Sequence, residues 1–244
     1  MGITQQKLDT LLSQIKQACL RSQRNPLDVQ LIAVTKTQSI EQICQAMALG
    51  IQCVGENKAQ ELKAKFQVFS KMQFDKNLAT PSVPTLAWHY IGSLQTNKVK
   101  DVVPLVSLIH SVDRLELAQE INKRCLALGK VMPILIQVNC SGESSKHGCQ
   151  PEKTFDLVKA ITPLPAIKII GLMTMAQKTT PPQGTDDILT TKVRKTFSHL
   201  RRLKYELNAQ GFDHIIELSM GMSDDFQIAI EEGATIIRIG SALF

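Results

Sequence analysis

The chain has 244 residues, 43% of them hydrophobic, which is enough for one large domain or two small ones with a sizeable core. The formal net charge is +6, but the basic residues are scattered and aromatic residues are few, so the composition does not favour a nucleic-acid-binding surface. None of the six cysteines forms a Cys-x-x-Cys pair, which indicates a reducing compartment without disulfides or a zinc site. Neither a signal-peptide pattern nor an apolar run of transmembrane length is present, so we expect a cytoplasmic protein that does not contact membranes.

Short apolar runs bounded by polar residues recur along the chain and are typical of buried parallel strands. An amphipathic helix at Ile3–Arg21 comes before the first of them. In chain order we predict strands at Leu31–Lys36, Gln52–Glu56, Ala87–Gly92, Leu108–Val112, Pro133–Val138, Ile167–Met173, His214–Ser219 and Thr235–Gly240. The segments between them predict helices at Ser39–Gly50, Lys58–Phe69, Asp113–Leu128, Pro151–Ile161, Ile188–Gln210 and Asp224–Glu232, a short helix after Lys98, and polar loops at Lys71–Thr85 and Gln177–Asp187.

This alternation of strands and helices predicts a parallel sheet, and eight such units predict an α/β fold of the (β/α)8 TIM-barrel type, in a single domain over residues 1–244. An open doubly wound sheet is the alternative. The glycine fingerprint of a dinucleotide site is absent after the first strand, which counts against that alternative.

Lys36 is the first residue that the fold does not explain. It ends the first predicted strand, at the edge of the sheet where α/β folds place their chemistry. Lysines are almost never fully buried without a partner, so packing is a poor reason for this one. A surface lysine just past the end of a strand is the plain alternative.

A barrel brings all strand ends to one mouth, and the ends of the seventh and eighth strands often bind phosphate there. Here these ends read Ser219-Met-Gly-Met-Ser223 and Gly240-Ser241. Small residues let the backbone approach an anion, serine hydroxyls donate to it, and the helix expected from Asp224 offers free N–H groups. Alternatively, Ser223 is only a helix N-cap and Gly221 only a turn residue.

Arg238 lies inside the otherwise apolar eighth strand. Alternation places Arg238 with Gly240 on one face and Ile237 with Ile239 on the other. The isoleucines must meet the helix layer, so the arginine is expected to point into the barrel. A buried arginine needs an acceptor, which is either Glu217 or Glu56, or a ligand atom beside the phosphate.

One cavity would then hold a lysine amine, an anion site and an inward arginine, and a lysine with a phosphate site is the combination that binds pyridoxal 5′-phosphate through a Schiff base. Several motifs then make the chain similar to the pyridoxal phosphate homeostasis family, to which the proline synthase co-transcribed homologues belong. These motifs are Ala33–Lys36, Gly55–Asn57, Trp88–Lys98, Gly171–Met173, Leu218–Ser223 and Arg238–Ser241. The resemblance runs from the first strand to the eighth.

The resemblance implies a fold-type III barrel like the amino-terminal domain of alanine racemase, with Lys36 as the lysine that holds the cofactor. It also implies that Arg238 faces the pyridine nitrogen, and that Asn57 and His89 lie near the cofactor. The phosphate-binding stretches implied by it contain Ser219, Met220, Gly221, Met222, Ser223, Gly240 and Ser241.

The same resemblance separates a carrier from an enzyme. Racemases of this type use a second acid/base, a tyrosine from an added domain of a partner chain, whereas the two tyrosines here, Tyr90 and Tyr205, fall in the third strand and a long helix. An arginine beside the pyridine nitrogen discourages its protonation and makes the ring a weak electron sink.

We therefore expect a monomeric protein that carries or buffers pyridoxal 5′-phosphate without catalysis and contributes to vitamin B6 and amino-acid homeostasis. Pyridoxal phosphate-dependent apoenzymes are the expected partners. An amino-acid racemase or another fold-type III enzyme remains the alternative. A nucleic-acid or protein scaffold is a third reading, which rests only on the positive net charge.

Overall fold

The computed structural model describes residues 2–74, 86–143, 147–177 and 186–244. Its strands form a closed barrel in which each strand pairs in parallel with the next, and the last pairs with the first. This confirms the predicted (β/α)8 barrel and excludes the open sheet. The strands are β1 (Gln30–Val34), β2 (Cys53–Glu56), β3 (Ala87–Tyr90), β4 (Leu108–Val112), β5 (Met132–Gln137), β6 (Ile167–Met173), β7 (Glu217–Ser219) and β8 (Ile236–Ile239).

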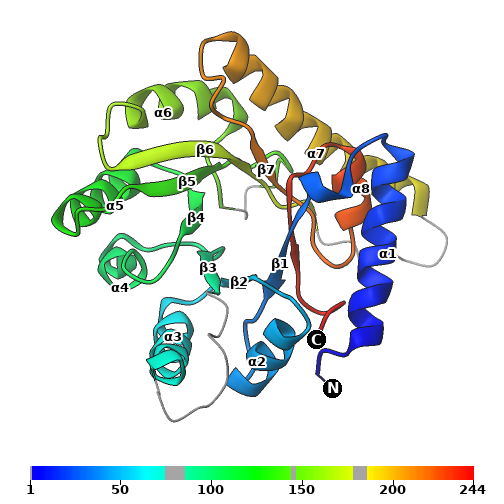
Figure 1. Ribbon diagram of the computed structural model, residues 1–244. Helices are drawn as coiled ribbons and strands as arrows, with labels where there is room; N and C mark the ends of the chain where they lie inside the picture. Colours follow the sequence, from blue (N-terminus) through cyan, green and yellow to red (C-terminus); the bar gives the residue numbers. More distant parts are fainter. Residues whose placement is uncertain (1, 75–85, 144–146, 178–185) are drawn as a thin grey trace.

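Helices surround the barrel, as Figure 1 shows, and they follow the strands in the predicted order. They are α1 (Gln5–Arg21), α2 (Ile40–Ala48), α3 (Ala59–Phe74), α4 (Val99–Val102), α5 (Leu115–Ala127), α6 (Thr154–Ile161), α7 (Asp186–Ala209) and α8 (Phe226–Glu231), with short 3-10 turns at Pro26–Asp28, Thr96–Lys98 and Pro151–Lys153. Within the described part of the chain, none of these helices is long and apolar enough to cross a membrane.

Local signals in the sequence explain the two ends of α2, the helix that follows the Lys36 turn. Ser39 Oγ accepts a hydrogen bond from Gln42 N, and Gln42 Oε1 accepts one from Ser39 N, which is a capping box. After the helix, Gly50 adopts a φ of +92°, the left-handed conformation that ends many helices.

Several element boundaries differ from the prediction by a few residues, and three of these shifts have a clear local cause. The third helix continues through Phe74, because no glycine or proline interrupts it, so the first four residues of the loop expected at Lys71–Thr85 are helical. Strand β7 begins late, because Ile215 N turns back to donate to Phe212 O. Helix α8 starts later than predicted, because the turn after β7 continues to Asp225, whose N donates to Met222 O. Residues 75–85 and 178–185, in the two expected loops, lie outside the described residues.

Two apolar layers fill the molecule. The larger one lies between strands and helices and contains Ile237 and Ile239 of β8. The smaller one lies inside the barrel and consists of Ile32, Cys53, Leu108, Leu135, Met173 and Ile236. Ile236 therefore faces the barrel interior and Ile237 faces the helices, which confirms the predicted alternation. The same alternation places the Arg238 side chain inside the barrel, next to the smaller apolar layer.

Candidate functional site

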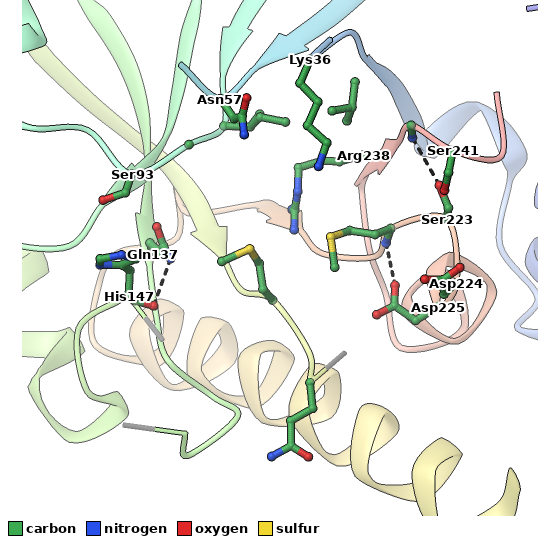
Figure 2. A pocket seen from close by; sticks show the side chains of 17 residues that line it. Lys36, Asn57, Ser93, Gln137, His147, Ser223, Asp224, Asp225, Arg238 and Ser241 are labelled. Carbon is green, nitrogen blue, oxygen red and sulfur yellow. Dashed lines mark hydrogen bonds between the residues drawn. The ribbon is translucent and has the colours of Figure 1, made fainter. Parts of the chain in front are cut away.

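A cavity of about 420 Å³ opens at the carboxyl ends of the strands. Figure 2 shows how its labelled side chains converge from different strand ends, with Lys36 reaching in after β1 and Arg238 coming from β8. Residues from seven of the eight strand ends or the loops after them line it. Such a gathering at one end of a parallel barrel is where TIM-barrel proteins hold their ligands.

Lys36 extends into this cavity from the turn after β1 (Figure 2). Its backbone follows the buried Thr35, and its own side chain is exposed. Within the described residues its Nζ has no hydrogen-bond or ion-pair partner. The structure therefore places an amine without a competing partner at the mouth of the barrel, where it is accessible to an electrophile.

Arg238 is only 4% exposed and points into the barrel from β8. Its Nη1 donates to Ser219 Oγ at 2.6 Å and its Nη2 donates to Thr174 O at 3.1 Å. Burial lowers the pKa of Arg238 to about 10, with the Asp225 carboxylate acting in the opposite direction. The guanidinium therefore stays charged at neutral pH, and its remaining N–H groups are available to the cavity.

The two carboxylates that the sequence suggested as acceptors for Arg238, Glu217 and Glu56, are wrong. Glu56 accepts hydrogen bonds from Lys65 Nζ and the Thr35 hydroxyl on the outer side of the barrel. Glu217 accepts from the Thr235 hydroxyl. Neither carboxylate reaches the arginine, whose acceptors are a hydroxyl and a carbonyl, so the guanidinium keeps its full positive charge beside the cavity.

Two buried histidines continue the hydrogen bonds of Arg238. Ser219 Oγ lies 2.9 Å from His110 Nδ1, and His110 Nε2 lies 3.1 Å from His89 Nδ1. Burial lowers the pKa of His89 to about 4, and burial followed by the neighbouring His89 and Arg238 holds the pKa of His110 well below its usual value. Both imidazoles are therefore neutral, and they support the arginine rather than line the cavity.

The loops after β7 and β8 form a group of hydrogen-bond donors. Ser223 Oγ accepts from Gly240 N at 3.3 Å and from Ala242 N at 3.2 Å, so its own hydroxyl proton is left to donate outward. Among the described residues, the backbone N–H groups of Ser223, Asp224 and Ser241 have no acceptor. Free N–H groups and hydroxyls at one edge suit a multiply charged anion.

The shape of this edge depends on Gly221, whose φ is +95° and whose substituted Cβ would meet Ala229 Cβ at 2.6 Å. Met222 N, in contrast, is not free, because it donates to Asp225 Oδ1 at 2.6 Å. Since α8 starts at Phe226 and has six residues, the helix N-terminus expected at Asp224 adds nothing here. The donors come from the turn itself.

Asn57 contributes an acceptor from the opposite side. It follows β2 and lines the cavity, and its Oδ1 is buried without a hydrogen-bond partner in the described part of the chain. The turn that holds it packs tightly against Gly92, where a Cβ would come within 2.1 Å of Asn57 O. An unpaired buried acceptor is unfavourable, so a donor on a ligand is expected to complete it.

The structure divides the predicted site residues into two groups. Those that line the cavity are Lys36, Asn57, Met222, Ser223, Arg238, Gly240 and Ser241. Those that lie outside its lining are His89, Ser219, Met220 and Gly221. Lining residues that the sequence did not single out include Ile91, Gln137, His147 and Gln177. Gln137 was detectable, because it interrupts an apolar strand as Arg238 does; its Nε2 donates to His147 O at 3.0 Å.

The chain is similar to known proteins over almost its whole length. The family model described as alanine racemase, N-terminal domain, matches residues 6–244. The pyridoxal phosphate homeostasis protein of Aquifex aeolicus is 39% identical over 239 residues, which cover 98% of this chain and 96% of the relative. The protein of the same name from Vibrio alginolyticus is 37% identical over 244 residues, covering 100% and 97%.

Solved structures agree with this relationship. PipY of Synechococcus elongatus, with PLP bound, has a TM-score of 0.74 and 33% identity, and the alignment covers 95% of this chain and 99% of PipY. The alanine racemase of Clostridium difficile shares the fold at a TM-score of 0.72 and 17% identity, covering 100% of this chain and 60% of the racemase. The chain therefore belongs to the pyridoxal phosphate homeostasis protein family, within the barrels described by the alanine racemase N-terminal domain.

Proposed function

We propose that this protein binds pyridoxal 5′-phosphate in the cavity at the barrel mouth, and that it carries or buffers the cofactor for vitamin B6 and amino-acid homeostasis. The names of its relatives and the PLP-bound structure of PipY support this. One observation carries the proposal: a lysine amine shares a cavity with a buried arginine and with backbone N–H groups, and within the described part of the chain neither the amine nor these N–H groups have a partner.

The residues of the cavity fit the groups of this cofactor. Lys36 Nζ would condense with the aldehyde carbon to an imine, with the aldehyde oxygen and two amine protons leaving as water, and this is the link by which lysines hold pyridoxal phosphate. Ser223, Ser241 and the free N–H groups beside them would donate to the phosphate. Arg238 would donate to the pyridine nitrogen from inside the barrel. When bound, the cofactor supplies an electrophilic carbonyl and, in enzymes, an electron sink.

A carrier suits this chain better than a racemase. Neither tyrosine lines the cavity: Tyr90 is buried, with its hydroxyl 3.4 Å from Asn57 O and 3.3 Å from Ser93 O, and Tyr205 is 59% exposed on α7. Arg238, as a charged donor, would keep the ring nitrogen without a proton. On this proposal the protein acts as a cytoplasmic monomer and delivers the cofactor to pyridoxal phosphate-dependent apoenzymes.

An absorption spectrum of the purified protein with added cofactor, recorded before and after borohydride reduction, tests the proposal. We expect a yellow imine band, and after reduction the cofactor's mass on the peptide that contains Lys36. Lys36→Ala is expected to fold and to lose the band, because this exposed side chain adds little to the core. Lys100→Ala, an exposed lysine outside the cavity, is the control.

A Lys36→Ala protein that keeps the full band would overturn the assignment of the lysine. The loaded wild-type protein, incubated with L-alanine in deuterium oxide, separates carrier from racemase. Deuterium incorporation near background is expected. Turnover at about 1–1,000 per second, the usual scale for enzymes, would restore the racemase interpretation.

A further inference from the structure

Side chains outside the cavity hold the backbone on both sides of Lys36. Before the lysine, Thr35 O accepts a hydrogen bond from Lys65 Nζ at 2.6 Å. After it, Thr37 N donates to Glu61 Oε2 at 3.2 Å. Lys65 and Glu61 lie four residues apart on α3, with Nζ and Oε2 separated by 3.7 Å. One turn of one helix therefore ties down both neighbours of the amine-bearing residue.

Glu56 completes this cluster from the end of β2. Its Oε1 accepts from the Thr35 hydroxyl at 2.6 Å and from Lys65 Nζ at 2.8 Å. The Glu56 side chain is fully buried and that of Lys65 is 12% exposed, so the ion pair is shielded from water. A buried pair of this kind holds its geometry, because moving either partner would leave the other charge uncompensated.

Thr37, in the turn after Lys36, has a backbone conformation that threonine disfavours. Its φ is +64°, in the left-handed region that β-branched residues strongly avoid. The bond to Glu61 opposes relaxation of this residue. The hydrogen bond from Thr37 N is the main cause that lowers the pKa of the Glu61 carboxyl, whereas partial burial raises it. Glu61 therefore holds Thr37 as a charged carboxylate at neutral pH.

We propose that Glu61, Lys65 and Glu56 are positioning residues that hold the backbone of Lys36 so that its amine points into the cavity. This deepens the function proposed above and rests on it. A lysine side chain has several freely rotating bonds, so the protein controls the amine mainly through the direction in which Cβ leaves the chain. Fixing the residues before and after Lys36 raises the fraction of time that Nζ spends near a bound aldehyde.

The clamp consists of Glu61, Lys65 and Glu56 with their bonds to Thr35 and Thr37. Glu61→Ala tests it, and Glu120→Ala is the matched control. Glu120 pairs with Arg124 four residues on in α5, and its side chain is 19% exposed against 28% for Glu61. Two ligands are compared: pyridoxal 5′-phosphate, by the rate at which the imine band forms, and pyridoxine 5′-phosphate, whose alcohol cannot form an imine, by equilibrium binding. Glu61→Ala is expected to slow imine formation about tenfold, equivalent to about 1.4 kcal/mol, without changing pyridoxine phosphate binding. Glu120→Ala is expected to change neither.

Thr37→Gly provides a rescue, because glycine adopts a positive φ without strain. In a Thr37→Gly background, Glu61→Ala is expected to reduce the rate of imine formation by a clearly smaller factor than it does in the protein with Thr37. A crystal structure of the cofactor-free Glu61→Ala protein is expected to show Thr37 outside the left-handed region.

An unchanged rate, an equal loss for both ligands, or a Thr37 that keeps its positive φ in Glu61→Ala would overturn the clamp. Failure of the proposed function looks different, since the wild-type protein would then form no imine band at all. The φ of Thr37 is measured without cofactor and still decides the clamp in that case.

Discussion

At the scale of single residues, Ser219 and Ser223 show how strand position separates two similar side chains. Ser219 is on β7, fully buried, and its Oγ accepts from Arg238. Ser223 lies four residues further on at the edge of the cavity, where its Oγ accepts two backbone N–H groups and its proton has no acceptor within the described residues. Only the second serine is placed to donate to a ligand.

Ser223→Ala is therefore expected to weaken the binding of pyridoxal 5′-phosphate by about 1.5–3 kcal/mol, the usual contribution of a hydrogen bond to a charged group. Binding of pyridoxal, which lacks the phosphate, is expected to stay the same. Spectroscopic titration with both ligands measures the difference. Ser219→Ala is the comparison and is expected to affect both ligands alike, since it acts through Arg238. Equal losses for Ser223→Ala would place the phosphate elsewhere.

The sequence predicted the unusual positions of the site more successfully than the hydrogen-bond partners of the side chains at those positions. Lys36 and Arg238 are detectable because charged side chains interrupt or end apolar strands, and Gln137 carries the same signal. The partners of Arg238 were not detectable, because they depend on the stagger between strands across the barrel interior. That stagger brings Ser219 and a carbonyl to the guanidinium, whereas Glu56 pairs with Thr35 and Lys65, and Glu217 with Thr235.

At the scale of elements, a chain of hydrogen bonds crosses four strands in one direction. The guanidinium of Arg238 on β8 can only donate, so Ser219 Oγ on β7 accepts from it. Ser219 Oγ contacts His110 Nδ1 on β4, and His110 Nε2 contacts His89 Nδ1 on β3; we expect the serine to donate to Nδ1 and His110 Nε2 to donate to His89. With the serine proton on the His110 side each of these bonds has a donor and an acceptor, whereas an Nδ1 proton on His110 would leave the serine proton without an acceptor among the described residues.

We expect both buried histidines to be neutral and protonated at Nε2 at pH 7. Nitrogen-15 NMR of the histidine side chains distinguishes the tautomers directly. His214, which is exposed, is the control for an imidazole without a fixed tautomer. An imidazolium signal, or an Nδ1 proton on His110, would contradict the direction of the chain.

The order of the elements was predictable, and their ends were less so. Alternating apolar runs and helical stripes extend over many residues, so an error at one position leaves the pattern intact. The start of β7 and the start of α8 instead depend on single turn hydrogen bonds, from Ile215 N to Phe212 O and from Asp225 N to Met222 O. Such bonds compete closely with the regular ladder and leave little trace in composition.

At the scale of the whole molecule, closure of the barrel creates the site. The first and last strands pair in parallel, with Ile32 beside Arg238, so Lys36 and Arg238 reach one cavity although about two hundred residues separate them. In an open sheet β1 and β8 would lack this pairing. Stability of the barrel and integrity of the site are therefore coupled, and conditions that loosen the interior are expected to affect both.

Acid is one such condition, because the interior holds two neutral histidines. The folded pKa of His89 is about 4 and that of His110 is also lowered, whereas an unfolded histidine titrates near 6.5. Between these values the unfolded chain binds more protons than the folded one. The stability that the two neutral histidines contribute is therefore fully present above about pH 6.5 and is lost as the pH falls toward 4. For His89 alone the loss is on the order of 3 kcal/mol at most.

Urea unfolding of the cofactor-free protein at pH 7.5 and pH 5 measures this loss of stability. His89→Gln is expected to flatten this dependence and His214→Gln to leave it, whereas equal wild-type stability at both pH values would show that the histidines are not buried as neutral groups.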